Sequence, residues 1–141
     1  MNREIKFRGK SLHTGEWHYG NLMQVGDACY IHEPGTAGFF TDPETVGQFT
    51  ELYDCKGNGI YDGDILGAKG KVIGWVKGGV RGYCYDVVYV NHPAGESRWT
   101  LYSTVKDDYP EQIEVIGNIY DNSELLKGGN YGTQDKHLGS P

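Results

Sequence analysis

Short runs of alternating apolar and polar residues recur along the first third of the chain. Residues 3–10 place Ile5 and Phe7 on one side of an extended segment and mostly charged residues on the other. Such period-two alternation is typical of a half-buried strand. Two further extended runs follow at 16–25 and 28–32, separated by a Gly-Asp turn signal. The pattern predicts three strands that follow one another as a meander.

The middle of the chain is punctuated by turn signals. Asp42 and Pro43 are suited to the cap and first position of a single helical turn, and residues 54–59 form a polar turn with two glycines. Gly78-Gly79 separates two apolar runs and predicts a two-residue hairpin, because glycine readily adopts positive φ. Counting outward from that turn pairs Trp75 with Gly82, Gly74 with Tyr83 and Lys71 with Asp86.

The last third predicts two strands and a short helical turn. The strands are expected at 99–105 and 114–120, and Asn122 can cap a turn through Leu126. Residues 128–141 have no apolar periodicity, which predicts a mobile tail. We therefore expect one domain over residues 1–127.

Composition agrees with this pattern of short strands. The chain has 141 residues, a length typical of one domain, and it contains 22 Gly and 11 Tyr. Turn-rich sequences with large aromatic side chains favour small β folds and argue against a helical bundle. The sequence predicts a mainly β fold: a single domain, a partly open β-barrel of short strands, with a short C-terminal helical turn.

Several functional classes are disfavoured by simple counts. The longest uninterrupted apolar runs have four residues, far short of the ~20 that cross a bilayer, and no apolar segment follows the charged N-terminus. We therefore expect no membrane partner and a cytoplasmic location. Cys29, Cys55 and Cys84 form no Cys-x-x-Cys pair, so we expect three free thiols.

Candidate catalytic and metal-binding chemistry is weak. The loop 54–65 begins like a calcium loop, but Lys56 stands at a ligand position and Ile65 where a closing Glu is needed. Asp62 and Asp64 could serve a small hydrolase, but a glycine-centred turn, in which an aspartate accepts hydrogen bonds from local amides, is the favoured explanation. The five histidines show no metal-ligand spacing. We therefore assign no catalytic residue, no cofactor and no metal.

One basic and aromatic segment could bind single-stranded nucleic acid. No acid occurs between Asp64 and Asp86, and basic side chains there alternate with aromatic ones that can stack on bases. The alternative is a solvated hairpin whose lysines protect a sheet edge, which a net charge of −6 favours. The candidate nucleic-acid residues within 69–85 are Lys69, Lys71, Trp75, Lys77, Arg81 and Tyr83.

Three blocks of the sequence, taken together, resemble the YopX protein family. They are REIKFRGK with GEWxYGxL in residues 3–22, TVGQFT through IYDGDI in 45–65, and EVIGNIYDNSELL in 114–126. The resemblance implies a small protein encoded by a bacteriophage or prophage, with a mainly β, barrel-like structure and no established activity. Some members are oligomeric. The chain departs from the family pattern at Glu51, where glycine is common, and at Cys55 and Gly59.

These observations together favour a non-enzymatic binding or assembly module in the cytoplasm of a bacterial host cell. Many short strands leave edges to be covered, so we expect a homo-oligomer, and a protein partner is a further option. Two alternatives remain: single-stranded nucleic-acid binding through residues 69–85, and a small hydrolase that uses Asp62 or Asp64.

Overall fold

The structure is a computed structural model that describes residues 6–78, 84–90, 97–127 and 131. The chain divides into two compact units, Met1–Glu51 and Leu52–Pro141, here called unit 1 and unit 2. The single domain over residues 1–127 that the sequence predicts spans both units, and it stays a prediction.

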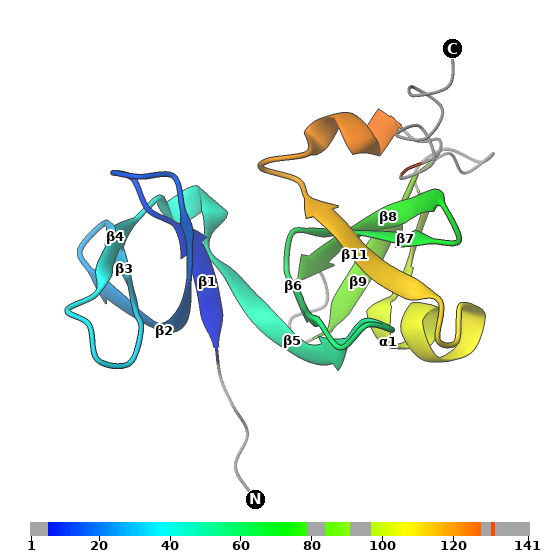
Figure 1. Ribbon diagram of the computed structural model, residues 1–141, viewed down its shortest axis with the longest axis horizontal. Coiled ribbons are helices and arrows are strands. Elements are labelled where there is room, and N and C mark those ends of the chain that lie inside the picture. The colour runs from blue at the N-terminus through cyan, green and yellow to red at the C-terminus, as the bar shows by residue number, and fades with distance from the viewer. Residues whose placement is uncertain (1–5, 79–83, 91–96, 128–130, 132–141) are drawn as a thin grey trace, which may run out of the picture. The chain divides into compact units, whose positions relative to one another are not determined.

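The described chain is mainly β, as predicted, and its strands form two antiparallel sheets. One sheet has the order β4-β3-β2-β1-β5-β6, and the other has the order β10-β9-β8-β7-β11 (Figure 1). Neither sheet closes into a barrel within the described residues, so the predicted barrel is not confirmed. No helix in this part of the chain is long and apolar enough to cross a membrane.

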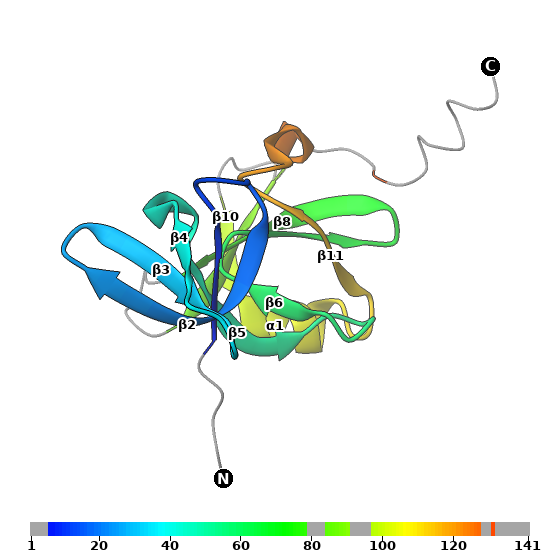
Figure 2. The same cartoon turned by 60° about the vertical axis from the view of Figure 1, so that its left-hand side comes forward.

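Unit 1 is built from the predicted meander. β2 and β3 form a long hairpin, and β2 also pairs with β1 (Figure 2). The meander continues through β4 and a single 3-10 turn, η1, in which the Asp42 carboxylate accepts a hydrogen bond from Glu44 N at 3.1 Å, as the Asp-Pro signal predicted. The elements are β1 (Phe7–Lys10), β2 (Trp17–Val25), β3 (Ala28–His32), β4 (Phe39–Thr41), η1 (Pro43–Thr45) and β5 (Gly47–Tyr53), which runs into unit 2.

Unit 2 holds the five-stranded sheet and most of the buried apolar side chains. Its strands are β6 (Gly59–Tyr61), β7 (Asp64–Ala68), β8 (Lys71–Gly78), β9 (Tyr85–Tyr89), β10 (Ser97–Thr100) and β11 (Ile113–Asn118). The core cluster comprises Ile60, Leu66, Ala68, Val76, Val87, Leu101, Val105 and Ile113. Burying each of its larger side chains is worth about 1.5–3 kcal/mol, so this cluster is the main source of stability in unit 2.

The predicted two-residue turn at 78–79 is wrong. β8 continues through Gly78, and its register pairs Trp75 with Val88 and Lys77 with Asp86. This register sets Val76 opposite Val87, both fully buried, whereas the predicted one would place Val87 beyond the end of β8. Burial of two valines outweighs the turn preference of glycine. Residues 79–83, which include Gly82 and Tyr83, lie outside the described residues.

The tight turn occurs one hairpin earlier. Lys69 and Gly70 connect β7 to β8, with φ of 52° and 85°. Positive φ at both central residues is the type I′ pattern, which matches the twist of the flanking strands. Lys69 is therefore a turn residue of the β7–β8 hairpin.

The strand predicted at 99–105 is only partly present. β10 ends at Thr100, which caps a helical segment by accepting a hydrogen bond from Ser103 N at 3.1 Å. The segment comprises α1 (Leu101–Ser103) and a π-helical turn, η2 (Thr104–Asp108). Leu101 and Val105, four residues apart, share a helix face and are both buried, so core packing overrides the β propensity of the run.

The C-terminal helical turn is confirmed. η3 (Ser123–Lys127) is a 3-10 turn, in which Leu125 N donates to Asn122 O at 2.9 Å. Most of the predicted tail, 128–130 and 132–141, lies outside the described residues. Tyr131 is among the described residues, and its ring packs over Gly67 of β7.

Candidate functional site

The structure places three of the candidate nucleic-acid residues on one strand. Trp75 and Lys77 occupy alternate positions of β8, so they share a face, whereas Lys71 lies before a shift in the β7–β8 register. The Lys77 ammonium lies 5.5 Å from the centre of the Trp75 ring, a cation–π contact. Lys77 is also opposite the buried Asp86 in the register. Lys69 lies in the adjoining turn, and Arg81 and Tyr83 fall outside the described residues.

Asp54 is the best-connected acid of unit 2. Its carboxylate accepts hydrogen bonds from Lys56 N at 2.9 Å, Asn58 N at 2.8 Å and Val115 N at 2.9 Å, and from the Asn58 side-chain amide. Both of its oxygens serve the protein itself, which supports the interpretation of residues 54–59 as a structural turn. Burial of the carboxyl opposes ionisation, but the hydrogen bonds from Val115, Asn58 and Lys56 outweigh it and lower the pKa of Asp54.

Asp64 also has a structural role. It is 1% exposed and accepts a hydrogen bond from Tyr61 N at 2.7 Å across the turn between β6 and β7. Gly63, with φ of 95°, lies in that turn and donates to Val76 O of β8 at 2.8 Å, which ties the turn to β8. A carboxylate buried among its own turn amides is poorly placed to meet a substrate, so the geometry favours the turn interpretation over a hydrolase.

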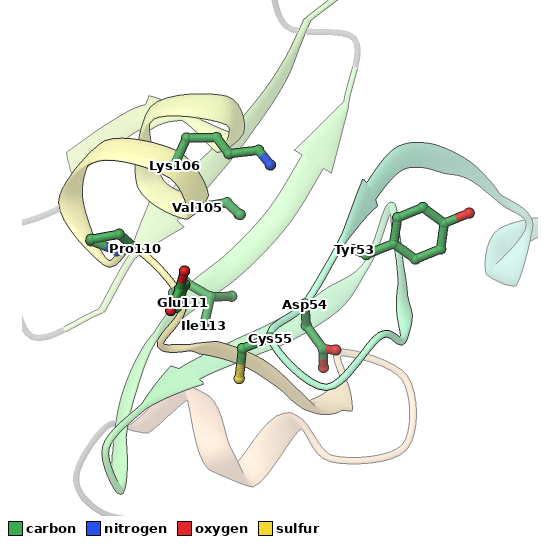
Figure 3. Close-up of a pocket in the computed structure, with 8 residues that line it drawn as sticks. All are labelled: Tyr53, Asp54, Cys55, Val105, Lys106, Pro110, Glu111 and Ile113. Atoms are coloured by element: carbon green, nitrogen blue, oxygen red, sulfur yellow. The ribbon is translucent and has the colours of Figure 1, made fainter.

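A hollow with a volume of about 300 Å³ lies next to the Asp54 turn in unit 2 (Figure 3). That volume is at the lower end of the range for small-molecule pockets. The exposed Cys55 thiol lies on one side, but the lining includes no histidine to act as its base, and the Asp54 carboxylate is occupied by amides. The lining residues are Tyr53, Asp54, Cys55, Val105, Lys106, Pro110, Glu111 and Ile113.

The cysteines of the chain form no disulfide with one another. All three cysteines are free thiols, as predicted, with Cys29 buried and Cys55 exposed. Across the described ranges, no group of three or more His, Cys, Asp or Glu side chains is placed to hold a metal ion.

A second polar cluster holds Tyr131 against the sheet. Tyr131 N donates to Gly70 O at 2.9 Å, its hydroxyl donates to Glu114, and Glu114 also bonds Lys56 at 2.9 Å. The ring lies so close to Gly67 that an added Cβ there would be 2.3 Å from Tyr131 Cε1. Burial and the bond to Glu114 raise the pKa of Tyr131 to about 12, and bonds from Tyr131 and Lys56 lower the pKa of Glu114.

Unit 1 presents apolar side chains to solvent on one face of its sheet. In the register Met23 is opposite Tyr30, and Tyr30 is opposite Phe40, so the three lie in a row across β2, β3 and β4. Met23 and Val25 are 52% and 61% exposed. The Tyr30 and Phe40 rings are 5.5 Å apart, centre to centre. Burial of Ile31, on the opposite face of β3, shows which side is the core.

We call this surface the outer apolar face. Leu12 extends it, because Leu12 N donates to Phe40 O at 3.0 Å and its side chain is 50% exposed. None of its residues is charged. The sequence itself indicates this surface, because Leu22 and Met23 are adjacent and β2 is therefore apolar on both faces. The outer apolar face comprises Leu12, Met23, Val25, Tyr30 and Phe40.

The fold and these surfaces define a small mainly β protein with an exposed apolar face on the sheet of unit 1. A family model for the YopX protein matches residues 6–127, so the chain belongs to the YopX family. A search of curated proteins gives no match.

Proposed function

We propose that this YopX-family protein is a non-enzymatic assembly module that associates with further copies of itself through the outer apolar face. The observation that carries the proposal is the uncharged row of Met23, Tyr30 and Phe40, which unit 1 leaves in water. Sizeable exposed apolar patches commonly mark interaction sites.

A second copy is the occupant that this chemistry favours. Homodimer interfaces are more apolar than transient ones and resemble a protein core cut in half. The face has no charged member, so nothing on it selects a partner of opposite charge. A two-fold contact would bring the same row from both copies together and exclude water from Met23 and Phe40. The overall charge of −6 opposes self-association, so added salt should strengthen it.

The test compares carboxylates placed on the two sides of β2. Met23→Glu puts a charge on the outer apolar face, whereas Gln24→Glu puts the same charge one residue away on the other side of the strand. We expect Met23→Glu to weaken association at least about 100-fold in sedimentation, because the interface would bury two unpaired carboxylates. Gln24→Glu should leave association close to that of the wild type.

The proposal fails if the two variants sediment alike, or if the wild type is a strict monomer at tens of micromolar. Thermal melts of both variants separate loss of association from loss of folding. The bacteriophage or prophage origin, and the cytoplasm of a bacterial host as the place of action, are proposals that rest on family resemblance.

Single-stranded nucleic-acid binding is a second candidate function. The observation in its favour is the cation–π contact between Lys77 and Trp75, which share a face of β8. We expect an oligonucleotide to bind at low salt, to dissociate steeply as salt rises, and to bind more weakly when Lys77 and Arg81 become Ala. Absence of binding at low ionic strength would exclude this function.

A further inference from the structure

A histidine lies at the end of the outer apolar face. The His13 ring is 6.0 Å from the Phe40 ring, centre to centre, and the Phe40 ring is 5.5 Å from the Tyr30 ring. The row that begins at Met23 on β2 therefore continues through Tyr30 and Phe40 to His13. His13 adds an imidazole to this row, and histidine is the side chain that changes its charge between pH 5 and pH 8.

The turn between β1 and β2 holds His13 in this place. Ser11, which is 6% exposed, accepts hydrogen bonds through its hydroxyl from His13 N at 3.1 Å and from Thr14 N at 3.2 Å. Leu12 N donates to Phe40 O at 3.0 Å, which ties the same turn to β4. The backbone of His13 is therefore fixed beside Phe40, while the residue itself is exposed and can take up a proton from solvent.

We propose that His13 makes association through the outer apolar face sensitive to pH, because the contact forms with neutral imidazoles and weakens when they are protonated. This inference rests on the proposed function and names its regulation. A two-fold contact that excludes water from Phe40 also covers the ring beside it, so His13 of each copy lies in the contact. A neutral imidazole can pack against aromatic rings there, whereas a buried imidazolium without an anionic partner is costly.

The direction of the effect follows from the number of bound protons. In the free chain the exposed His13 takes up a proton as the pH falls, whereas in the assembly the contact keeps the ring neutral. The free chain therefore binds more protons than the assembly does, and a lower pH favours dissociation. Since each copy contributes one His13, we expect the association constant to fall about tenfold from pH 8 to pH 6.

The overall charge of the chain acts in the opposite direction. The net charge is −6 with the histidines neutral, so protonation of histidines lowers the repulsion between copies. Other titratable or charged side chains share the outer face of strands β1 to β4, or flank His13 in the turns that follow β1 and β4. They are Arg8, Lys10, Glu16, Tyr19, Tyr30, His32 and Asp42. Among these, histidine is the residue type that ordinarily changes its charge between pH 8 and pH 6, so His32 is the group to compare with His13.

Two single substitutions identify the sensor. His13→Gln keeps a polar side chain but removes the imidazole, so its association should no longer weaken from pH 8 to pH 6 and should strengthen slightly as the net charge falls. His32→Gln is the matched control, because it removes an imidazole from the same face of β3, two residues after Tyr30. It should keep the tenfold weakening of the wild type.

A permanent charge gives a second readout. His13→Lys should associate at least tenfold more weakly than the wild type at pH 8, and it should lose the weakening between pH 8 and pH 6. The inference is overturned if His13→Lys associates like the wild type at pH 8. It is also overturned if His32→Gln loses the pH dependence while His13→Gln keeps it.

Sedimentation at pH 8 and pH 6 separates this inference from the proposed function. Met23→Glu tests the proposed function at pH 8 and leaves His13 in place. If the wild type associates through Met23 to the same extent at both pH values, the inference fails and the proposed function stands. A wild type that is monomeric at both pH values overturns both. Thermal melts at each pH show whether the variants stay folded.

Discussion

The two edges of the five-stranded sheet show two ways of managing the same problem. The β11 edge is covered from within the chain by the Asp54 turn, which contacts a residue 61 positions away through the Val115 amide. The β10 edge has a neighbouring strand on one side only among the described residues, and Arg98 and Trp99 are exposed there. The comparison teaches that a polar side chain held by its own turn can occupy edge amides that would otherwise be open to another strand.

Removal of the covering carboxylate should have the largest effect. Asp54→Ala leaves the Val115 amide without its acceptor and removes the bonds that close the turn. We expect a loss of about 3 kcal/mol in the free energy of unfolding, measured by urea denaturation. Asp54→Asn, which keeps one acceptor oxygen, should lose less. Equal losses for the two variants would show that hydrogen bonding is not what Asp54 contributes.

The same edge predicts a dependence of stability on pH. The pKa values of Asp54 and Glu114 are lowered in the folded state, so their contribution is present above the unfolded values near 4 and is lost as pH falls below them. The pKa of Tyr131 is raised to about 12, so its contribution is lost as pH rises from about 10. Melts across pH should show both losses.

Variants assign each limb of that profile. Tyr131→Phe should flatten the alkaline limb and leave most of the acidic one, whereas Asp54→Asn should remove the Asp54 part of the acidic limb and leave the Glu114 part. An alkaline limb that is unchanged in Tyr131→Phe would contradict the assignment.

A methyl group at Gly67 should detach Tyr131. The added Cβ would overlap the ring at 2.3 Å, and the ring is a side chain that can swing away. We therefore expect Gly67→Ala to cost about 1–2 kcal/mol in unfolding free energy. The double variant with Tyr131→Ala should cost little more than either single change, since both remove one contact. Strict additivity in this cycle would show that the two residues act independently.

The smallest expected effect is a gain. Glu51, three residues before Asp54, has φ of 71°, a left-handed conformation that is strained for any residue with a side chain. Glu51→Gly should stabilise the chain by about 0.5–1 kcal/mol in thermal unfolding, because the relieved strain exceeds the added chain entropy. Glu51→Ala, which keeps a Cβ, should give no such gain. Destabilisation by glycine would indicate that the Glu51 side chain contributes more than the strain costs.

Local signals predicted much of the fold. The alternating runs of unit 1 became β1 to β3, the Asp-Pro pair became a capped turn, and residues 114–118 lie in β11. Glu51, where the family resemblance led us to expect glycine, has a positive φ, a conformation that glycine adopts without strain. Each of these features is determined by residues within a few positions of one another.

Features set by distant contacts were missed. The β8–β9 register follows from burial of Val76 against Val87, and the helical segment after β10 follows from burial of Leu101 and Val105. Neither contact can be predicted from the Gly78-Gly79 turn signal or from strand propensity, because both depend on which side chains are buried together. For the candidate sites, the turn role of residues 54–59 was predicted, but the bond from Asp54 to Val115 was not. The outer apolar face needed the register that sets Met23, Tyr30 and Phe40 in a row.

The position of Tyr131 bears on how this protein should be trimmed for experiments. The family match ends at residue 127, yet the sheet surface is completed four residues later, where an aromatic ring fills the space above Gly67. A shortened version that stops at the family boundary would expose bare backbone on β7 and leave Glu114 with Lys56 alone. The backbone exposed on β7 adds a new site for self-association. Self-association measured on the shortened version should therefore be compared with that of a version ending after residue 131.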